Sequence, residues 1–399
     1  MASFESTGCN ESESSKMSTH GRVLVAMSGG VDSSVAAVML SEQGYEVIGI
    51  TMKTWDYAAT GPSGGKQIGC CTLESMNDAR SVALKYGFTH FIIDIREEFG
   101  DWVIDRFTDE YMAGRTPNPC VLCNTHIKWA ALLKRADALG CDAIATGHYA
   151  RVRHDDVSGR HVLMKGLDDN KDQSYALWGV DQAHFAQTIL PLGTHSKPEI
   201  RRMATDFGLD RVADKPDSYE ICFVPDNDYR RFLRDRVTRL DEKVGPGDFV
   251  TADGSVIGRH DGYPFYTIGQ RHGLGLALGH PVYVTGIDAK QNRITVGPRD
   301  ELMKQALVAR QINLIKYDRL DDVLSATGKI RYKDEGAPCR VSQTAADELE
   351  VVFEMPRPAV TPGQAVVLYE GDDVLGGAWI HHVVESETRR QPRESALRG

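Results

Sequence analysis

The hydrophobic pattern of the first half of the chain alternates between strand-length apolar runs and amphipathic helical stretches. Wholly apolar runs are typical of strands buried on both faces of a parallel sheet. The predicted strands cover about 22–26, 46–52, 90–95 and 142–146, and the helices about 35–40, 73–85, 99–112 and 127–139. This alternation predicts βαβ units and an α/β fold whose parallel sheet is covered by helices on both faces.

From about residue 210 the pattern changes. After a last clear helix at about 230–240, glycine and proline interrupt short apolar runs at 282–284, 293–296, 350–353 and 365–369. Short strands at this spacing predict a small closed β-barrel or sandwich. The expected parts are a disordered leader (1–20), an α/β catalytic domain (21–212), a central linker domain (213–283), a C-terminal β-domain (284–385) and a disordered tail (386–399).

The first predicted strand runs into Ser28–Ser34, with the sequence SGGVDSS. Two glycines allow a tight turn whose backbone N–H groups can surround an anion. Asp32 and Ser33 are placed to cap the next helix, whose N-terminus favours phosphate. Neither GxxxxGK[ST] nor GxGxxG occurs in this stretch. The string resembles the PP-loop of the ATP pyrophosphatase (N-type) superfamily, which implies ATP binding, adenylyl transfer to a substrate oxygen and release of pyrophosphate.

Three segments fall at the carboxyl ends of predicted strands: Ser28–Ser33, Met52-Lys53 and Gly147-His148. Ligands of open parallel sheets bind beyond the carboxyl ends of the strands. We therefore expect these segments to meet in one nucleotide-binding crevice.

Composition narrows the class of partner and the compartment. The net charge of −10 argues mildly against a nucleic acid partner, although basic stretches such as Arg230–Arg236 and Lys329–Lys333 can form local binding faces. No apolar run reaches the roughly 18–20 residues that span a bilayer, and the first 20 residues lack the apolar core of a secretory signal. We expect a cytoplasmic protein that does not contact a membrane.

Eight cysteines without a secretory signal indicate buried, catalytic or metal-binding thiols rather than structural disulfides. Cys141 and Cys339 are expected in the core, and a structural role is favoured for Cys70-Cys71. Cys120 and Cys123 lie in Gly114–Asn124 (GRTPNPCVLCN), a proline-stiffened loop that runs into a helix. The helix dipole lowers the pKa of a thiol near its N-terminus. This CxxC is compatible with a redox dithiol, an iron–sulfur ligand pair or half a zinc site, but no second CxxC or CxxH exists to complete a zinc site.

Together these strings resemble the tRNA-specific 2-thiouridylases, the family that thiolates the wobble uridine. The matching strings run in order from SGGVDSS through GRTPNP, ATGHY, NKDQSY, ICF, TIGQRHGLG and RY to TPGQ. The resemblance implies an enzyme that adenylylates the base oxygen and transfers persulfide sulfur to C2, releasing AMP and pyrophosphate. It implies ATP and Mg²⁺ as cofactors. The implied partners are tRNA, bound through its anticodon stem-loop, and a sulfur-carrier protein or cysteine desulfurase as sulfur donor.

The resemblance also assigns residues to roles. Cys123 matches the nucleophile and Cys222 the cysteine that carries the persulfide. The positions implied for ATP binding are Ala26, Met27, Ser28, Gly29, Gly30, Val31, Asp32, Ser33, Met52 and Gly147. Those implied for tRNA binding are Asn118, Pro119, Cys120, His148, Lys171, Asp172, Gln173, Arg331, Tyr332 and Gln364. The charge of Asp32 suits it to help hold Mg²⁺ against pyrophosphate.

One departure leaves the sulfur chemistry open. Many family members have Asp where this chain has Cys120. Cys120, Cys123 and Cys222 would supply three ligands for a four-iron four-sulfur cluster with one open corner. In the favoured alternative, a two-thiol relay, Cys120 only borders the base and a Cys123–Cys222 disulfide remains for reduction.

Two other functions are compatible with parts of the sequence. An amide-forming ligase that uses ammonia would need the phosphate loop but no crevice thiols. A non-catalytic RNA-binding redox protein would need the CxxC but no phosphate loop.

Overall fold

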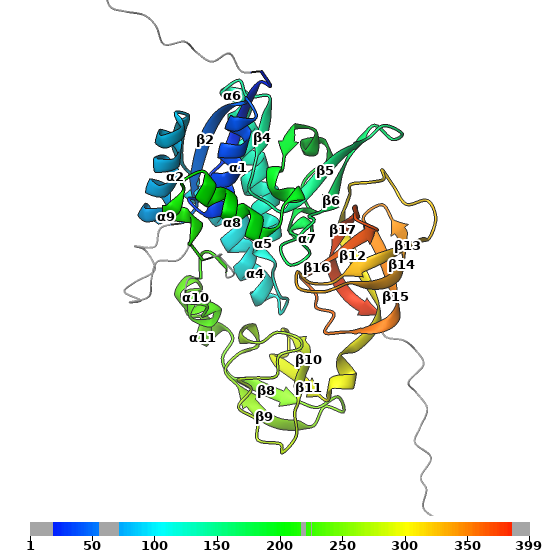
Figure 1. The fold of residues 1–399 in the computed structure, drawn as a ribbon. Coiled ribbons are helices and arrows are strands. Elements are labelled where there is room, and N and C mark those ends of the chain that lie inside the picture. Colours follow the sequence, from blue (N-terminus) through cyan, green and yellow to red (C-terminus); the bar gives the residue numbers. More distant parts are fainter. Residues whose placement is uncertain (1–18, 56–71, 217–220, 225, 385–399) are drawn as a thin grey trace, which may run out of the picture.

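The computed structural model describes residues 19–55, 72–216, 221–224 and 226–384 (Figure 1). The predicted tail, Cys9, Cys70-Cys71 and all of the predicted leader except residues 19 and 20 lie outside the described residues. No helix within the described ranges is both long and apolar enough to cross a bilayer.

The first part of the chain is built on a five-stranded parallel sheet of order β3-β2-β1-β4-β7, which confirms the predicted α/β fold. Its strands are β1 (Arg22–Ala26), β2 (Glu46–Lys53), β3 (Thr89–Asp94), β4 (Ala143–Ala145) and β7 (Thr188–Ile189). The helices of this part are α1 (Val31–Glu42), α2 (Leu73–Tyr86), α3 (Arg96–Phe99), η2 (Gly100–Asp105), α4 (Arg106–Met112), α5 (Pro119–Leu122), η3 (Cys123–Trp129), α6 (Ala130–Ala138), α7 (Ser174–Leu177), η4 (Gln182–Gln187), η5 (Pro191–Thr194), α8 (Lys197–Asp206) and α9 (Asp210–Ala213).

Alternate residues of β1 face opposite layers, as the twofold repeat of a strand requires. Val23 and Val25 belong to a buried cluster with residues of α1, α2, α8 and α9. Leu24 belongs to a second cluster, together with Trp129 of η3 and Leu132 of α6. Both faces of the sheet are therefore covered, and β1 is at its centre.

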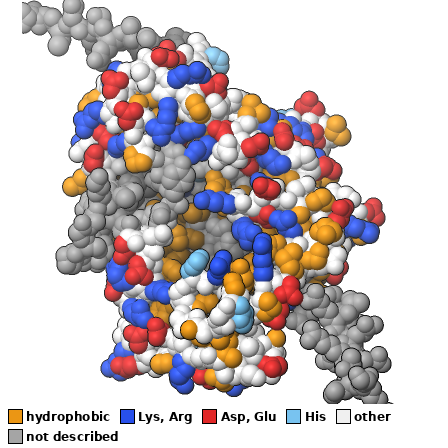
Figure 2. Space-filling view, turned by 60° about the horizontal axis from the view of Figure 1, so that its bottom comes forward, with side chains coloured by type: hydrophobic (Ala, Val, Ile, Leu, Met, Phe, Trp, Pro, Cys, Tyr) orange, Lys and Arg blue, Asp and Glu red, His pale blue; other side chains and the backbone are white. Residues whose placement is uncertain are grey.

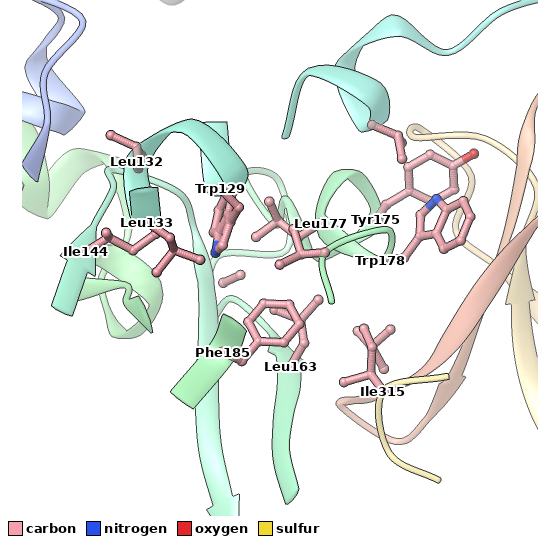
Figure 3. Close-up of a cluster of buried hydrophobic side chains, with 14 of the residues drawn as sticks. Trp129, Leu132, Leu133, Ile144, Leu163, Tyr175, Leu177, Trp178, Phe185 and Ile315 are labelled. Carbon is pink, nitrogen blue, oxygen red and sulfur yellow. The ribbon is translucent and has the colours of Figure 1, made fainter. Parts of the chain in front are cut away.

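The second cluster continues from the sheet into the C-terminal part of the chain. Trp129, Leu132 and Ile144 lie at one side of Figure 3, and Tyr175 and Trp178 lie at the other, toward the barrel strands. The same cluster includes residues of β16 and β17. Because one core joins the two parts, the barrel is fixed against the catalytic domain.

The central part consists of two short helices and a four-stranded sheet of order β10-β11-β8-β9. Its elements are α10 (Tyr229–Arg236), α11 (Leu240–Lys243), β8 (Gly247–Val250), β9 (Val256–His260), η6 (Tyr263–Phe265), β10 (Tyr283–Asp288) and β11 (Arg293–Gly297). The expected domain boundary after residue 283 falls inside this sheet, because β11 pairs with β8 as well as with β10. The hairpin β10–β11 has the same local pattern as a barrel hairpin, so the sequence could not assign it to a sheet.

The C-terminal part is a closed barrel, as predicted. The ring order is β12-β15-β14-β13-β16-β17, and β17 pairs again with β12. The elements are η7 (Arg299–Leu302), β12 (Met303–Leu314), β13 (Leu324–Lys329), β14 (Ala337–Ala345), β15 (Glu348–Pro358), β16 (Ala365–Glu370) and β17 (Asp373–Val384). A hairpin of the catalytic part, β5 (Ala150–Asp155) and β6 (Arg160–Lys165), extends this sheet through a single β6–β17 pairing.

Candidate active site

The predicted phosphate-binding loop lies between β1 and α1. Gly29 has φ of +71°, and a Cβ at this position would lie 1.9 Å from the carbonyl oxygen of Ser75, so only glycine fits. The N–H of Ser28 donates a hydrogen bond to Ser33 Oγ at 3.0 Å, and the two hydroxyl oxygens lie 3.1 Å apart. These contacts hold the loop in a tight turn at the N-terminus of α1.

The prediction that Asp32 and Ser33 cap α1 is wrong. The N-cap is Gly30, with no side-chain cap, because the Ser33 hydroxyl turns back into the loop. The Asp32 carboxylate instead accepts hydrogen bonds from Lys197 Nζ at 2.7 and 2.8 Å and from the Tyr149 hydroxyl at 2.7 Å. An ammonium group therefore lies beside the phosphate cradle.

Two lysines that the sequence reasoning missed contact this loop. Lys197, the first residue of α8, is only 8% exposed. A cation at a helix N-terminus is unfavourable because it opposes the helix dipole. This unusual position is the feature of the sequence that could have identified Lys197. Lys215 donates from Nζ to the carbonyl oxygen of Gly29 at 3.2 Å and pairs with the buried Asp78. Both ammonium groups suit a site for a polyanion.

The other predicted nucleotide-binding residues lie at the same edge of the sheet. A Cβ on Gly147, just beyond β4, would lie 2.8 Å from both the Asp32 carbonyl carbon and the Ser33 nitrogen, so glycine is needed for this close approach. Met52 lies near the end of β2 and is partly buried. Ala26 ends β1, Met27 follows it and is buried, and Val31 begins α1. Gly147 thus approaches the phosphate loop directly, and Met52 is the last residue but one of the neighbouring strand β2.

The Gly114–Asn124 segment, here called the cysteine loop, is held by the barrel. The N–H of Thr116 donates to the carbonyl oxygen of Pro362 at 3.0 Å. Gln364 Nε2 donates to the carbonyl oxygens of Pro117 and Thr116 at 2.8 and 3.2 Å. Gln364, predicted as a tRNA contact, therefore fixes the backbone of the cysteine loop.

Asn118 precedes α5, Pro119 is its first residue, and the helix continues through η3 into α6. Cys120 is exposed, and desolvation of its thiol by the neighbouring protein raises the pKa of Cys120, with Lys128 acting in the opposite direction. The expected lowering of a thiol pKa by the helix dipole is thus wrong for Cys120. Cys123 is the fifth residue of the continuous helix, beyond its first turn.

Cys123 and Cys222 are both half-buried and pack against the same hydrophobic cluster. Phe223 anchors the segment that carries Cys222. Its ring is buried, with centroids 5.8 Å from Phe99 and 5.1 Å from Phe107. Two cysteines that are far apart in sequence therefore pack against one core.

The three cysteines do not fit a metal cluster. Within the described ranges no three His, Cys, Asp or Glu side chains are close enough together to hold a metal ion. An iron–sulfur cluster on Cys120, Cys123 and Cys222 would need the three thiols close together, and the described structure does not place them so.

His148, just beyond β4, is half-buried and packs against η3, where its ring lies 5.5 Å from that of Trp129. Its Nδ1 is 2.7 Å from Thr146 Oγ1, and its Nε2 is 3.5 Å from Lys128 Nζ. Burial, with a smaller contribution from Lys128, holds the pKa of His148 well below its usual range. The imidazole is therefore neutral at physiological pH, and Lys128 is a further cation that the sequence reasoning missed.

Two residues of the predicted tRNA-binding run Lys171–Gln173 face the protein. The buried carboxylate of Asp172 accepts hydrogen bonds from the N–H and the hydroxyl of Ser174 at 3.0 and 2.9 Å. Gln173 Oε1 accepts from the N–H of Tyr149 at 2.9 Å. Their side chains shape the loop behind the crevice.

Arg331 and Tyr332 are exposed on a barrel loop that the buried Asp334 holds in shape. The Asp334 carboxylate accepts the N–H of Ile330 at 3.0 Å and pairs with Arg357. The ring of Tyr332 lies 6.3 Å from that of Tyr175, next to the catalytic domain.

Figure 2 shows a hollow near the centre of one face, bordered by hydrophobic, Lys and Arg side chains.

Comparisons with known proteins agree with this architecture. Residues 21–226 match the tRNA methyl transferase HUP domain, residues 231–298 the tRNA methyl transferase PRC-barrel domain and residues 304–380 the aminomethyltransferase beta-barrel domain. The chain is 65% identical to the tRNA-specific 2-thiouridylase MnmA of Salinibacter ruber, over 94% of this chain and 98% of that protein. It is 57% identical to the proteins of the same name from Amoebophilus asiaticus (90% and 95% covered) and Cytophaga hutchinsonii (91% and 98% covered).

The fold and the site define a three-part nucleotide-binding protein whose phosphate loop and Cys123 lie in the α/β part, with Cys222 in the segment that follows α9. The chain belongs to the tRNA-specific 2-thiouridylase family.

Proposed function

We propose that this chain is an ATP-dependent tRNA sulfurtransferase that converts the wobble uridine to 2-thiouridine. One observation carries the proposal: a phosphate-binding loop and two cysteines that pack against a shared core occur in one chain of this family. An amide-forming ligase would not need the thiols, and a redox binding protein would not need the phosphate loop.

In the first step the phosphate loop binds ATP with Mg²⁺. Loop N–H groups and the helix α1 N-terminus bind phosphate oxygens, and Lys197 and Lys215 supply positive charge beside them. Asp32, whose carboxylate also pairs with Lys197, would help to hold Mg²⁺, and the ion would offset the negative charge of the pyrophosphate. The uridine O2 attacks the α-phosphorus and pyrophosphate leaves, which converts a poor leaving group into AMP.

In the second step the cysteines deliver sulfur. Cys222 carries a persulfide received from a donor, for which a sulfur-carrier protein or a cysteine desulfurase is proposed. The Cys123 thiolate attacks Cys222 Sγ and expels hydrosulfide, which adds at C2 and displaces AMP. A Cys123–Cys222 disulfide remains and is reduced by an external thiol.

The tRNA is bound between the catalytic domain and the barrel, with the target base extruded toward the cysteine loop. Exposed Arg331 and Tyr332, together with His148 and Lys171, are the proposed contacts. Asn118 and Pro119 border the base.

The test is tRNA-dependent release of pyrophosphate from ATP, measured with matched tRNAs that carry uridine or cytidine at the wobble position. We expect release only with the uridine form. Equal release with both tRNAs, or without tRNA, would contradict adenylylation of the base.

A further inference from the structure

The segment Thr267–Gly275, here called the GQR loop, has an ordered backbone although it contains no strand or helix. The N–H of Gly269 donates to the carbonyl oxygen of Val284 at 2.8 Å, and the N–H of Val284 donates to that of Gln270 at 2.9 Å. The Gln270 side chain donates to the carbonyl oxygen of His272 at 2.9 Å. The loop is therefore fixed to the edge of β10.

The GQR loop also contacts the other two parts of the chain. Thr267 lies next to Tyr111 of α4 and Tyr229 of α10, whose rings stack at 4.7 Å. Gly269 has φ of +89°, and a Cβ there would lie 2.9 Å from the Cβ of Ala359 in the barrel part. Contacts to all three parts hold the loop where those parts meet.

The contact with Ala359 places the GQR loop near the cysteine loop. The turn 359–364 touches Gly269 at its first residue and binds the backbone of Thr116 and Pro117 through Gln364 at its last. One short turn of the barrel thus supports both loops, and the GQR loop borders the region that the target nucleotide must enter.

The GQR loop presents a guanidinium group and an imidazole ring at the surface. Arg271 and His272 are exposed, and within the described ranges Arg271 makes no ion pair. Arg230 Nη2 lies 3.9 Å from the position of a Cβ on Gly273. Other arginines of α10 are neutralised: Arg231 pairs with Asp226 and Asp235, Arg234 with Asp241, and Arg236 with Asp105.

We propose that Arg271 and His272, with Arg230 beside them, bind the sugar–phosphate backbone of the tRNA whose wobble uridine lies at the cysteine loop. This inference rests on the proposed function. A guanidinium fork binds phosphate oxygens in two-point contacts, and neutralising a phosphate releases counterions. Because three parts of the chain already order the loop, little conformational entropy is lost on binding.

The test compares Arg271→Gln with Arg239→Gln, which removes an arginine of the same central part that is 73% exposed and paired with Glu242. The dissociation constant of unmodified tRNA is measured by fluorescence anisotropy at several salt concentrations. Arg271→Gln should weaken binding about five- to tenfold at low salt and reduce the salt slope by about one, as the loss of one phosphate contact predicts. Arg239→Gln should match the wild type in both.

Equal affinity and salt slope for wild type, Arg271→Gln and Arg239→Gln would overturn this inference and leave the proposed function standing. Absence of tRNA binding by the wild type would overturn both. Because Arg271 is exposed, unchanged ATP binding by the variant confirms that its fold is intact.

Discussion

Replacing Asp32 with Asn should stop AMP formation and also loosen the phosphate loop. Asp32 is part of the phosphate cradle and not of the hydrophobic core. This position alone predicts that the substitution leaves the fold intact. Its carboxylate, however, is the charge partner of Lys197, whose side chain is 8% exposed while that of Asp32 is 33% exposed. The asparagine removes the negative charge and keeps one acceptor oxygen.

The magnitude follows from the burial of the pair. Breaking a fully buried ion pair destabilises a protein by about 3–5 kcal/mol, whereas an exposed pair contributes about 0–1 kcal/mol. One partner here is buried and the other is one-third exposed, and the Asn oxygen retains part of the hydrogen bonding. We therefore expect the local opening free energy of α1 and α8 to fall by about 1–3 kcal/mol.

Hydrogen exchange of α1 and α8, read by mass spectrometry, measures this local opening. Asp156→Asn is the matched control, because Asp156 also contacts a basic side chain, His154, at 2.9 Å but is 97% exposed. That control should change the opening free energy by less than about 0.5 kcal/mol. If Asp32→Asn leaves both the exchange of α1 and α8 and AMP formation at wild-type levels, the role given to the Asp32–Lys197 pair is refuted.

Three further predictions concern the cysteine loop and its surroundings. Gln364→Leu removes two hydrogen bonds to this loop, so thiolation should slow roughly 5- to 100-fold while ATP affinity, measured by calorimetry, stays unchanged; an unaltered rate would count against the positioning role. Cys222→Ser should accumulate adenylylated tRNA, and Cys123→Ser should retain persulfide on Cys222, both detectable by mass spectrometry; 2-thiouridine formed by either variant would exclude the relay. The pKa of His148 in the folded protein lies well below its usual range. Below about pH 6.5 the unfolded chain therefore binds a proton at this residue that the folded protein does not bind. The free energy of unfolding should fall as the pH drops below about 6.5. His148→Asn should flatten this dependence by up to about 1.4 kcal/mol per pH unit in urea unfolding between about pH 5 and 6.5, and identical slopes would refute the assignment.

Local signals were enough to predict the sheet and the two loops that carry the chemistry. The apolar run of β1 and the glycines after it lie in one short stretch of sequence, and this stretch alone predicts a strand followed by a phosphate-binding turn. The prolines before Cys120 likewise lie within one short segment. The two faces of β1 follow from the twofold repeat of a strand. These features depend on residues adjacent in sequence.

The pairings between distant segments could not be predicted in this way. Lys197 contacts Asp32 across 165 positions, and Gln364 contacts Pro117 across 247 positions. No local pattern specifies either pairing, because each depends on how α8 or the barrel packs on the catalytic domain. For the same reason the thiol pKa of Cys120 was mispredicted: the helix dipole is a local effect, whereas the desolvation comes from the folded surroundings.

The most direct test of the account is mass analysis of tRNA nucleosides after the purified protein is incubated with unmodified tRNA, ATP and a persulfide source. We expect 2-thiouridine to appear at the wobble position, its formation to require ATP, and AMP to form in equal amount. Unmodified uridine after complete incubation, or 2-thiouridine formed without ATP, would contradict the claim that this chain activates the base with ATP and then transfers sulfur to it.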